Sequence, residues 1–175
     1  KRACEHPLEV CLKFDEMAQY LIDQGLGRRI NREEARQIVR DAAKAGLVHF
    51  VDNAEDKVKH NCNCCGCACW NVGTIRRRKI PRDELMAVYF IRKTDPDICV
   101  GCGECIDICP VAAIKLEDDI AKVDEDWCIG CGVCANKCEF DAINILYRGN
   151  QDKIPKDFET LHNTICRERT KKCTG

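Results

Sequence analysis

The residues best suited to chemistry in this chain are its cysteines, which number 17 among 175 residues. Eight of them form two runs with the spacing C-x2-C-x2-C-x3-C, and each cysteine of the first run has a counterpart 29 residues later. The first run is Cys99, Cys102, Cys105 and Cys109, and the second is Cys128, Cys131, Cys134 and Cys138. Thiolates at this density bind soft metals or iron–sulfur clusters. The repeat therefore predicts two similar metal centres.

The spacing within each run favours a cubane [4Fe-4S] cluster over a single zinc ion. Cysteines at i, i+3 and i+6 of one tight loop reach three irons of a cubane, and the fourth thiolate comes from the other run. A structural zinc site uses two cysteine pairs and does not explain two triplets with crossed fourth ligands. We expect one cluster on Cys99, Cys102, Cys105 and Cys138, and a second on Cys128, Cys131, Cys134 and Cys109.

Five further cysteines lie within eight residues, in the stretch Cys62-Asn-Cys-Cys-Gly-Cys-Ala-Cys69. This stretch predicts a third [4Fe-4S] cluster, wrapped by three of its cysteines with a remote fourth ligand. The expected ligands are Cys62, Cys65, Cys69 and Cys11. Cys64 and Cys67 offer a competing pair, and Cys4 is another candidate for the remote position. Zinc binding and reactive thiols stay open as alternatives here.

The elements that must position these cysteines divide the chain into four expected parts. These are a helical domain over 1–55, a Cys-rich loop and basic linker over 56–87, a two-cluster domain over 88–147 and a tail over 148–175. Apolar residues at helical spacing from Val10 to Ile22 predict a first helix. Asn31, with Glu34 three residues later, predicts the N-cap of a second. A short strand is expected over 47–51, and a short helix near Phe158.

Charge and composition exclude several function classes. From Asp95 to Ile145 there are 12 acidic residues against three lysines. Because the net charge of the whole chain is only −1, the residues outside this segment carry a net positive charge. The basic tracts are short and lack interleaved aromatic residues, so we expect no nucleic-acid partner. No apolar run is long enough to span a bilayer. Cysteines at cluster spacing do not form a secreted disulfide framework, and a cytoplasmic, anaerobic setting is expected.

The paired runs resemble the bacterial two-cluster ferredoxin family over about 60 residues. That resemblance implies an α+β domain of the (βαβ)₂ type with two [4Fe-4S] clusters. The chain as a whole has a helical region with Asp-Gln-Gly-Leu-Gly-Arg-Arg-Ile30, then the Cys-rich stretch, then the paired runs. This order is similar to that of iron–sulfur subunits of tungsten-dependent class II benzoyl-CoA reductases. This similarity implies three clusters and a larger tungstopterin partner of the aldehyde:ferredoxin oxidoreductase type. Further electron-donor subunits are compatible with it.

The expected function is electron transfer without catalysis by this chain itself, as a subunit that relays single electrons to or from a larger catalytic protein. A free-standing polyferredoxin shuttle and a cluster-based sensor or assembly scaffold are the alternatives. One position departs from the repeat: Glu139 follows Cys138, where Pro110 follows Cys109. Its negative charge is expected to lower the reduction potential of the cluster that Cys138 ligates.

Overall fold

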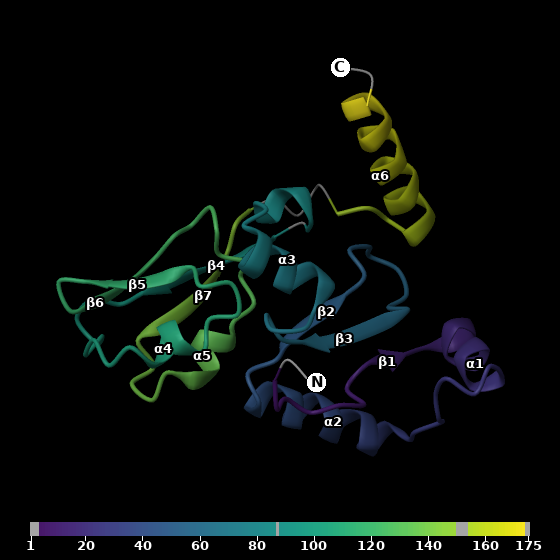
Figure 1. Cartoon of the computed structure of the whole chain (residues 1–175), viewed down its shortest axis with the longest axis horizontal. Coiled ribbons are helices and arrows are strands. Elements are labelled where there is room, and N and C mark those ends of the chain that lie inside the picture. The colour runs from purple at the N-terminus through teal and green to yellow at the C-terminus, as the bar shows by residue number, and fades with distance from the viewer. Residues whose placement is uncertain (1–3, 87, 150–153, 174–175) are drawn as a thin grey trace.

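The computed structural model describes residues 4–86, 88–149 and 154–173. Figure 1 shows an N-terminal lobe and a second lobe with helix α3 between them, and helix α6 standing apart from both. The structure is a mixture of helices and short strands. Within the described ranges, no helix has the length and apolar character needed to cross a membrane.

The N-terminal lobe is built on a three-stranded antiparallel sheet in the order β1-β3-β2. Its elements are β1 (Leu12–Lys13), α1 (Asp15–Asp23), α2 (Arg32–Lys44), β2 (Val48–Val51) and β3 (His60–Cys64). Leu12 lies opposite Asn61 on one side of β3, and Phe50 lies opposite Cys62 on the other. Because side chains alternate along a strand, Cys62 and Cys64 share one face of the sheet.

The helices of this lobe agree with the sequence in part. Asn31 caps α2 as predicted, and its Oδ1 accepts a hydrogen bond of 2.8 Å from the Glu34 N–H. Strand β2 confirms the strand expected over 47–51. The first helix begins at Asp15 and not near Val10, because Leu12 and Lys13 pair with β3 instead.

The segment expected as a Cys-rich loop and basic linker is largely regular, which corrects that prediction. Its first part is strand β3, and Cys69 is the N-cap of α3 (Trp70–Arg78), so the basic residues from Arg76 lie in a helix. A 3-10 turn, η1 (Arg82–Glu84), follows. The sequence pattern did not predict strand β3, because the residue that this strand buries is polar and not apolar. Asn63 is only 2% exposed, and its side chain donates to the Val10 carbonyl at 2.6 Å.

The second lobe carries the paired cysteine runs. Its elements are β4 (Phe90–Thr94), α4 (Glu104–Asp107), β5 (Ile114–Glu117), β6 (Ile120–Val123), α5 (Val133–Lys137) and β7 (Ile143–Tyr147). Strand β4 pairs antiparallel with β7, and β5 pairs antiparallel with β6. Thr94 Oγ1 donates to the Ala121 carbonyl at 2.5 Å and ties the two pairs together.

The two lobes share a hydrophobic core. Val48 of β2 and Val72 and Ile75 of α3 are buried in the same cluster as Val111 and Ile129 of the second lobe. The backbones also approach closely, because a Cβ added at Gly66 would lie 2.0 Å from the Pro110 carbonyl oxygen. The N-terminal lobe is therefore packed directly against the cysteine runs.

Helix α6 (Phe158–Cys173) is longer than the short helix expected near Phe158. The segment before it is held by a 2.9 Å hydrogen bond from the Glu55 N–H to the Pro155 carbonyl. Lys59 Nζ lies 4.6 Å from the centre of the Phe158 ring, a cation–π contact that fixes the start of the helix.

Candidate metal centres

Two aspartates, again 29 residues apart, shape the start of the cysteine loops. The carboxylates of Asp95 and Asp124 accept the backbone N–H two residues further along, at 3.0 and 3.1 Å. Their carbonyls accept the N–H of Cys99 and Cys128 at 3.0 and 2.9 Å. In such turns, hydrogen bonds within the loop itself pair the backbone N–H groups of the loop. The same local structure therefore delivers the first cysteine of each run.

The cysteines expected for the first cluster lie around one small cavity. Three come from the loop before and at the start of α4, and Cys138 comes from the end of α5. The lining also includes Val100 and Phe140, which are 57% and 48% exposed. The crossed arrangement expected from the repeat thus brings together Cys99, Cys102, Cys105 and Cys138.

The other four cysteines, Cys109, Cys128, Cys131 and Cys134, lie around a second small cavity. Burial raises the pKa of the Cys131 thiol to about 12 and that of Cys134 to about 11. Thiols whose pKa is raised in this way become thiolates when a metal centre supplies compensating positive charge. The donor set and its burial therefore fit a metal cluster.

A buried arginine lies between the two cavities. Arg92 of β4 is only 1% exposed, lines both cavities, and places Nη2 3.8 Å from Cys105 Sγ. Its Nε and Nη1 are buried without a hydrogen-bond partner among the described residues. A buried charge with orphaned donors is costly unless an anionic acceptor lies nearby. The sulfurs of two [4Fe-4S] clusters are such acceptors, so Arg92 is an independent sign that the cavities fit these groups.

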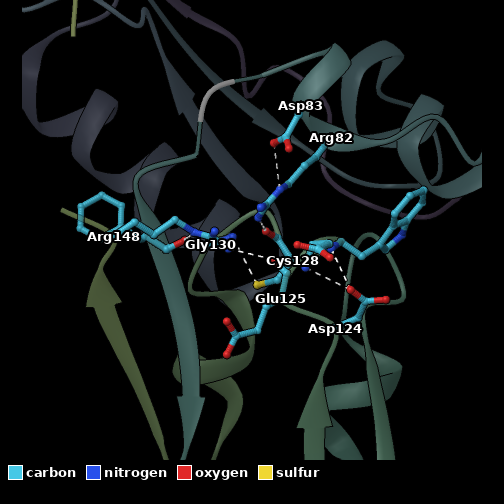
Figure 2. Close-up of polar contacts among 10 residues, drawn as sticks. Arg82, Asp83, Asp124, Glu125, Cys128, Gly130 and Arg148 are labelled. Atoms are coloured by element: carbon cyan, nitrogen blue, oxygen red, sulfur yellow. Dashed lines mark hydrogen bonds and ion pairs between the residues drawn. The ribbon is translucent and has the colours of Figure 1, made fainter. Parts of the chain in front are cut away.

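Figure 2 shows how polar side chains hold the loop of the second run. Arg82, 5% exposed, donates to the Cys128 carbonyl, and Arg148 Nη2 donates to the Glu125 carbonyl at 2.8 Å. The Gly130 N–H points to Cys128 Sγ at 3.5 Å. Hydrogen bonds to a cluster's sulfurs and backbone are a main means of setting its potential.

Two glycines are required by neighbouring backbone. Gly101 and Gly130 have φ of +67° and +64°. A Cβ on them would lie 2.5 Å from the Asp119 carbonyl oxygen and 2.2 Å from that of Phe90. These glycines let the cysteine loops pack tightly against strand β4 and the turn between β5 and β6.

A third group of cysteines gathers on the N-terminal lobe. The charges of Cys62 and Cys64 interact with each other and with Cys11, and both also interact with Cys69. The hydrogen bond from Cys64 lowers the pKa of Cys69 to about 6, against the effect of burial. Backbone N–H groups at the start of α3 add to this stabilisation of the thiolate. The structure therefore brings together Cys11, Cys62, Cys64 and Cys69.

Cys65, which the sequence grouped with Cys62 and Cys69, has different nearest partners. Its Sγ lies 3.7 Å from that of Cys4, and His6 and Cys67 complete a compact group of four. The structure thus forms two sets of four from the N-terminal ligands, where the sequence suggested one. Which cysteines ligate a third cluster stays a prediction.

The sequence pattern did not predict three features of the sites: the role of Arg92, the role of Arg82, and the grouping of His6 with Cys4, Cys65 and Cys67. Arg92 had a detectable signal, since its counterpart 29 residues later is Ala121. A charged residue at the position of a small buried one in a repeat marks a functional difference between the halves. The roles of Arg82 and His6 depend on tertiary contacts and leave no local pattern.

Comparison with known proteins agrees with this geometry. The family model described as a 4Fe-4S dicluster domain matches residues 91–156. The chain is 53% identical over 30 residues to a probable ferredoxin of Methanosarcina thermophila, a match that covers 17% of this chain and 52% of that protein. It is 54% identical over 24 residues to Ferredoxin-2 of Desulfomicrobium norvegicum, covering 14% and 41%.

A third relative is Ferredoxin 7Fe of Hydrogenibacillus schlegelii, 53% identical over 30 residues, or 17% of this chain and 35% of that protein. The matches thus span about half the length of these curated relatives or less. Residues 91–156 are a 4Fe-4S dicluster domain of the iron–sulfur ferredoxin type.

Proposed function

We propose that this chain is the electron-transfer subunit of an oxidoreductase complex and that it relays single electrons to or from a larger catalytic subunit. Each [4Fe-4S] cluster, when bound, takes up and releases one electron at a time. The observation that carries the proposal is Arg92, a buried cation facing two four-cysteine cavities at once. Its positive charge therefore acts on both centres.

The ligand sets follow from the groups that lie together. We infer that the first cavity holds one cluster on Cys99, Cys102, Cys105 and Cys138, and the second holds one on Cys109, Cys128, Cys131 and Cys134. A third cluster belongs on Cys11, Cys62, Cys64 and Cys69, with Cys64 in place of Cys65. The element order β4-α4-β5-β6-α5-β7 supports a (βαβ)₂ arrangement around the first two.

The three sets lie in series. Cys69 packs against the shared core. Gly66 of the same Cys-rich stretch lies against the carbonyl of Pro110, which lines the second cavity, so we infer that the third set lies on the side of that cavity. Arg92 then joins the second cavity to the first. Exposed apolar side chains stand at both ends of this series, with Val100 and Phe140 at the first cavity and Trp70, 69% exposed, next to Cys69. Such surfaces suit protein partners at the two ends.

The partner is inferred by resemblance and by the character of the cavities. Cysteines and mostly apolar side chains line both cluster cavities, so we infer that substrate chemistry takes place on another subunit. The order of the N-terminal lobe and the paired runs supports a tungstopterin partner of the benzoyl-CoA reductase type in an anaerobic cytoplasm.

Anaerobic purification of the untagged protein from its native cells tests this proposal. The chain should elute from gel filtration with a larger subunit, and mass spectrometry should identify that subunit as an oxidoreductase. Elution alone, at the 19.9 kDa of the chain, contradicts the subunit proposal and favours a shuttle. The short matches to ferredoxins are the observation that keeps the shuttle as the second candidate.

The third ligand set is tested separately by iron analysis and by EPR of the reduced protein. Cys64→Ser should lower the iron content by about four atoms per chain, which is one cubane. Cys166→Ser, an exposed position on α6, is the matched control and should leave iron unchanged. Equal iron in both variants contradicts the role of Cys64.

A further inference from the structure

We propose that Cys4, His6, Cys65 and Cys67 bind a single zinc ion, at a site separate from the clusters. Their four ligand atoms lie within 4.8 Å of one another. Cys4 Sγ and Cys65 Sγ are 3.7 Å apart. In a tetrahedral site with Zn–S bonds of about 2.3 Å, neighbouring sulfurs are about 3.8 Å apart. The separation of Cys4 Sγ and Cys65 Sγ therefore agrees with that of two ligands on one ion.

The compactness of this group distinguishes it from the cluster sites. A cubane binds its four thiolates through four different irons, so its ligands stand further apart than those of one ion. Among the residues that the structure describes, this is the one set of three or more His, Cys, Asp or Glu ligand atoms all within 4.8 Å. No three of the cysteine sulfurs around the two cavities all lie within this distance of one another.

The chemistry of the donors selects the metal. Three thiolates and one imidazole are a common structural zinc set, and four protein ligands close the coordination sphere. A closed site leaves no position for a substrate or an activated water. The ion would therefore stabilise the fold and take no part in electron transfer, since zinc has no redox chemistry in proteins.

The turn that carries Cys65 and Cys67 is fixed by its surroundings. Arg77 of α3 donates to the carbonyls of Gly66 and Cys67, at 2.8 and 2.5 Å. The backbone N–H groups of Ala68 and Cys67 donate to the Cys65 sulfur. Hydrogen bonds of this kind orient metal-binding thiolates. Two of the four ligands are thus held in place by contacts that do not involve the metal.

The position of the site suggests what it stabilises. Cys4 and Cys65 lie in a small hydrophobic cluster with Ala42 and Leu47, apart from the core around the two cavities. Between the two turn cysteines, Gly66 contacts Pro110, which follows Cys109 of the second run. A zinc ion there would fasten the N-terminal segment to the turn that packs on the second lobe.

Zinc analysis and X-ray absorption at the zinc edge test the proposal on the full chain purified anaerobically. The edge is specific for zinc, so iron in the clusters does not interfere. We expect about one zinc per chain, bound by three sulfurs at about 2.3 Å and one nitrogen at about 2.0–2.1 Å. Fully iron-loaded protein without zinc overturns the proposal. So does zinc bound by four sulfurs, because zinc would then occupy a cluster site.

Variants separate this site from the third cluster. Cys65→Ser should lose zinc and keep its iron, and Cys64→Ser should keep zinc and lose about four irons. Loss of iron rather than zinc in Cys65→Ser overturns the proposal and assigns Cys65 to a cluster. Because Cys65→Ser can also impair folding, His6→Cys is the second test. It should keep zinc and change the zinc signal to four sulfurs, and an unchanged signal excludes His6 as a ligand.

Discussion

Arg92 Nη2 lies 3.8 Å from Cys105 Sγ, and the same guanidinium lines the cavity of the second cysteine set. Burial raises the pKa of Cys105, and the positive charge of Arg92 opposes that rise. The arginine therefore favours negative charge on the cysteine sulfur. By the same electrostatics it should favour the added electron on either cluster, because reduction also increases negative charge.

The first prediction is that Arg92→Met lowers the reduction potentials of both clusters of the dicluster domain. One charge at about 8 Å, with an effective dielectric of about 20, contributes about 2 kcal/mol. That energy is about 90 mV for a one-electron couple. Redox titration followed by EPR measures both potentials. Lys93→Met is the matched control, because the neighbouring charge is exposed and pairs with Glu125, and its effect should be much smaller.

A second prediction concerns Glu139, which replaces the proline of the first run. Its side chain is exposed, so water screens its charge far more than that of Arg92. At about 10 Å in a dielectric near 80 the interaction is about 0.4 kcal/mol, or about 20 mV. Glu139→Gln should raise the potential of the cluster on Cys138 by this amount and leave the other unchanged. Equal shifts in both potentials, or a shift as large as that of Arg92→Met, contradict this reading.

The sequence predicted the dicluster domain far better than the N-terminal lobe. The reason is how far apart in the sequence the cysteines of each site lie. Three of the cysteines proposed to ligate each cubane lie in one short loop, so their spacing indicates the site directly. The N-terminal sites depend on strand pairing. Leu12 opposite Asn61 brings Cys11 beside Cys62, and strand alternation puts Cys62 and Cys64 on one face. No local spacing shows that Cys65 leaves this set to join Cys4.

The third prediction separates two glycines of the first loop. Gly101→Ala introduces a Cβ 2.5 Å from the Asp119 carbonyl oxygen, whereas an added Cβ at Gly103 has nothing within 4 Å. Both have positive φ, which costs about 1–2 kcal/mol for an alanine. Gly101→Ala should cost several kcal/mol more, because backbone must move to relieve the collision.

Iron content and the temperature of cluster loss measure this difference. Gly103→Ala should retain the clusters with a small decrease in that temperature. Gly101→Ala should be purified with little iron. If the two variants lose their clusters at the same temperature, the contact with Asp119 does not constrain the loop.

The last prediction is that Arg82→Met weakens the second cluster selectively. Arg82 is buried and donates to the carbonyl of Cys128, a ligand of that cluster in our proposal. Removing the donor leaves this part-buried carbonyl without the Arg82 hydrogen bond, at a cost of about 1–3 kcal/mol. In the presence of an iron chelator, the EPR signal of the second cluster should decay several-fold faster than in the unmodified protein, and that of the first should be unchanged.

Asp83→Asn is the control, since Asp83 pairs with Arg82 at 3.1 Å from an exposed position and such pairs contribute little. Equal acceleration of both decays would show that Arg82 supports the fold as a whole and not the loop of Cys128.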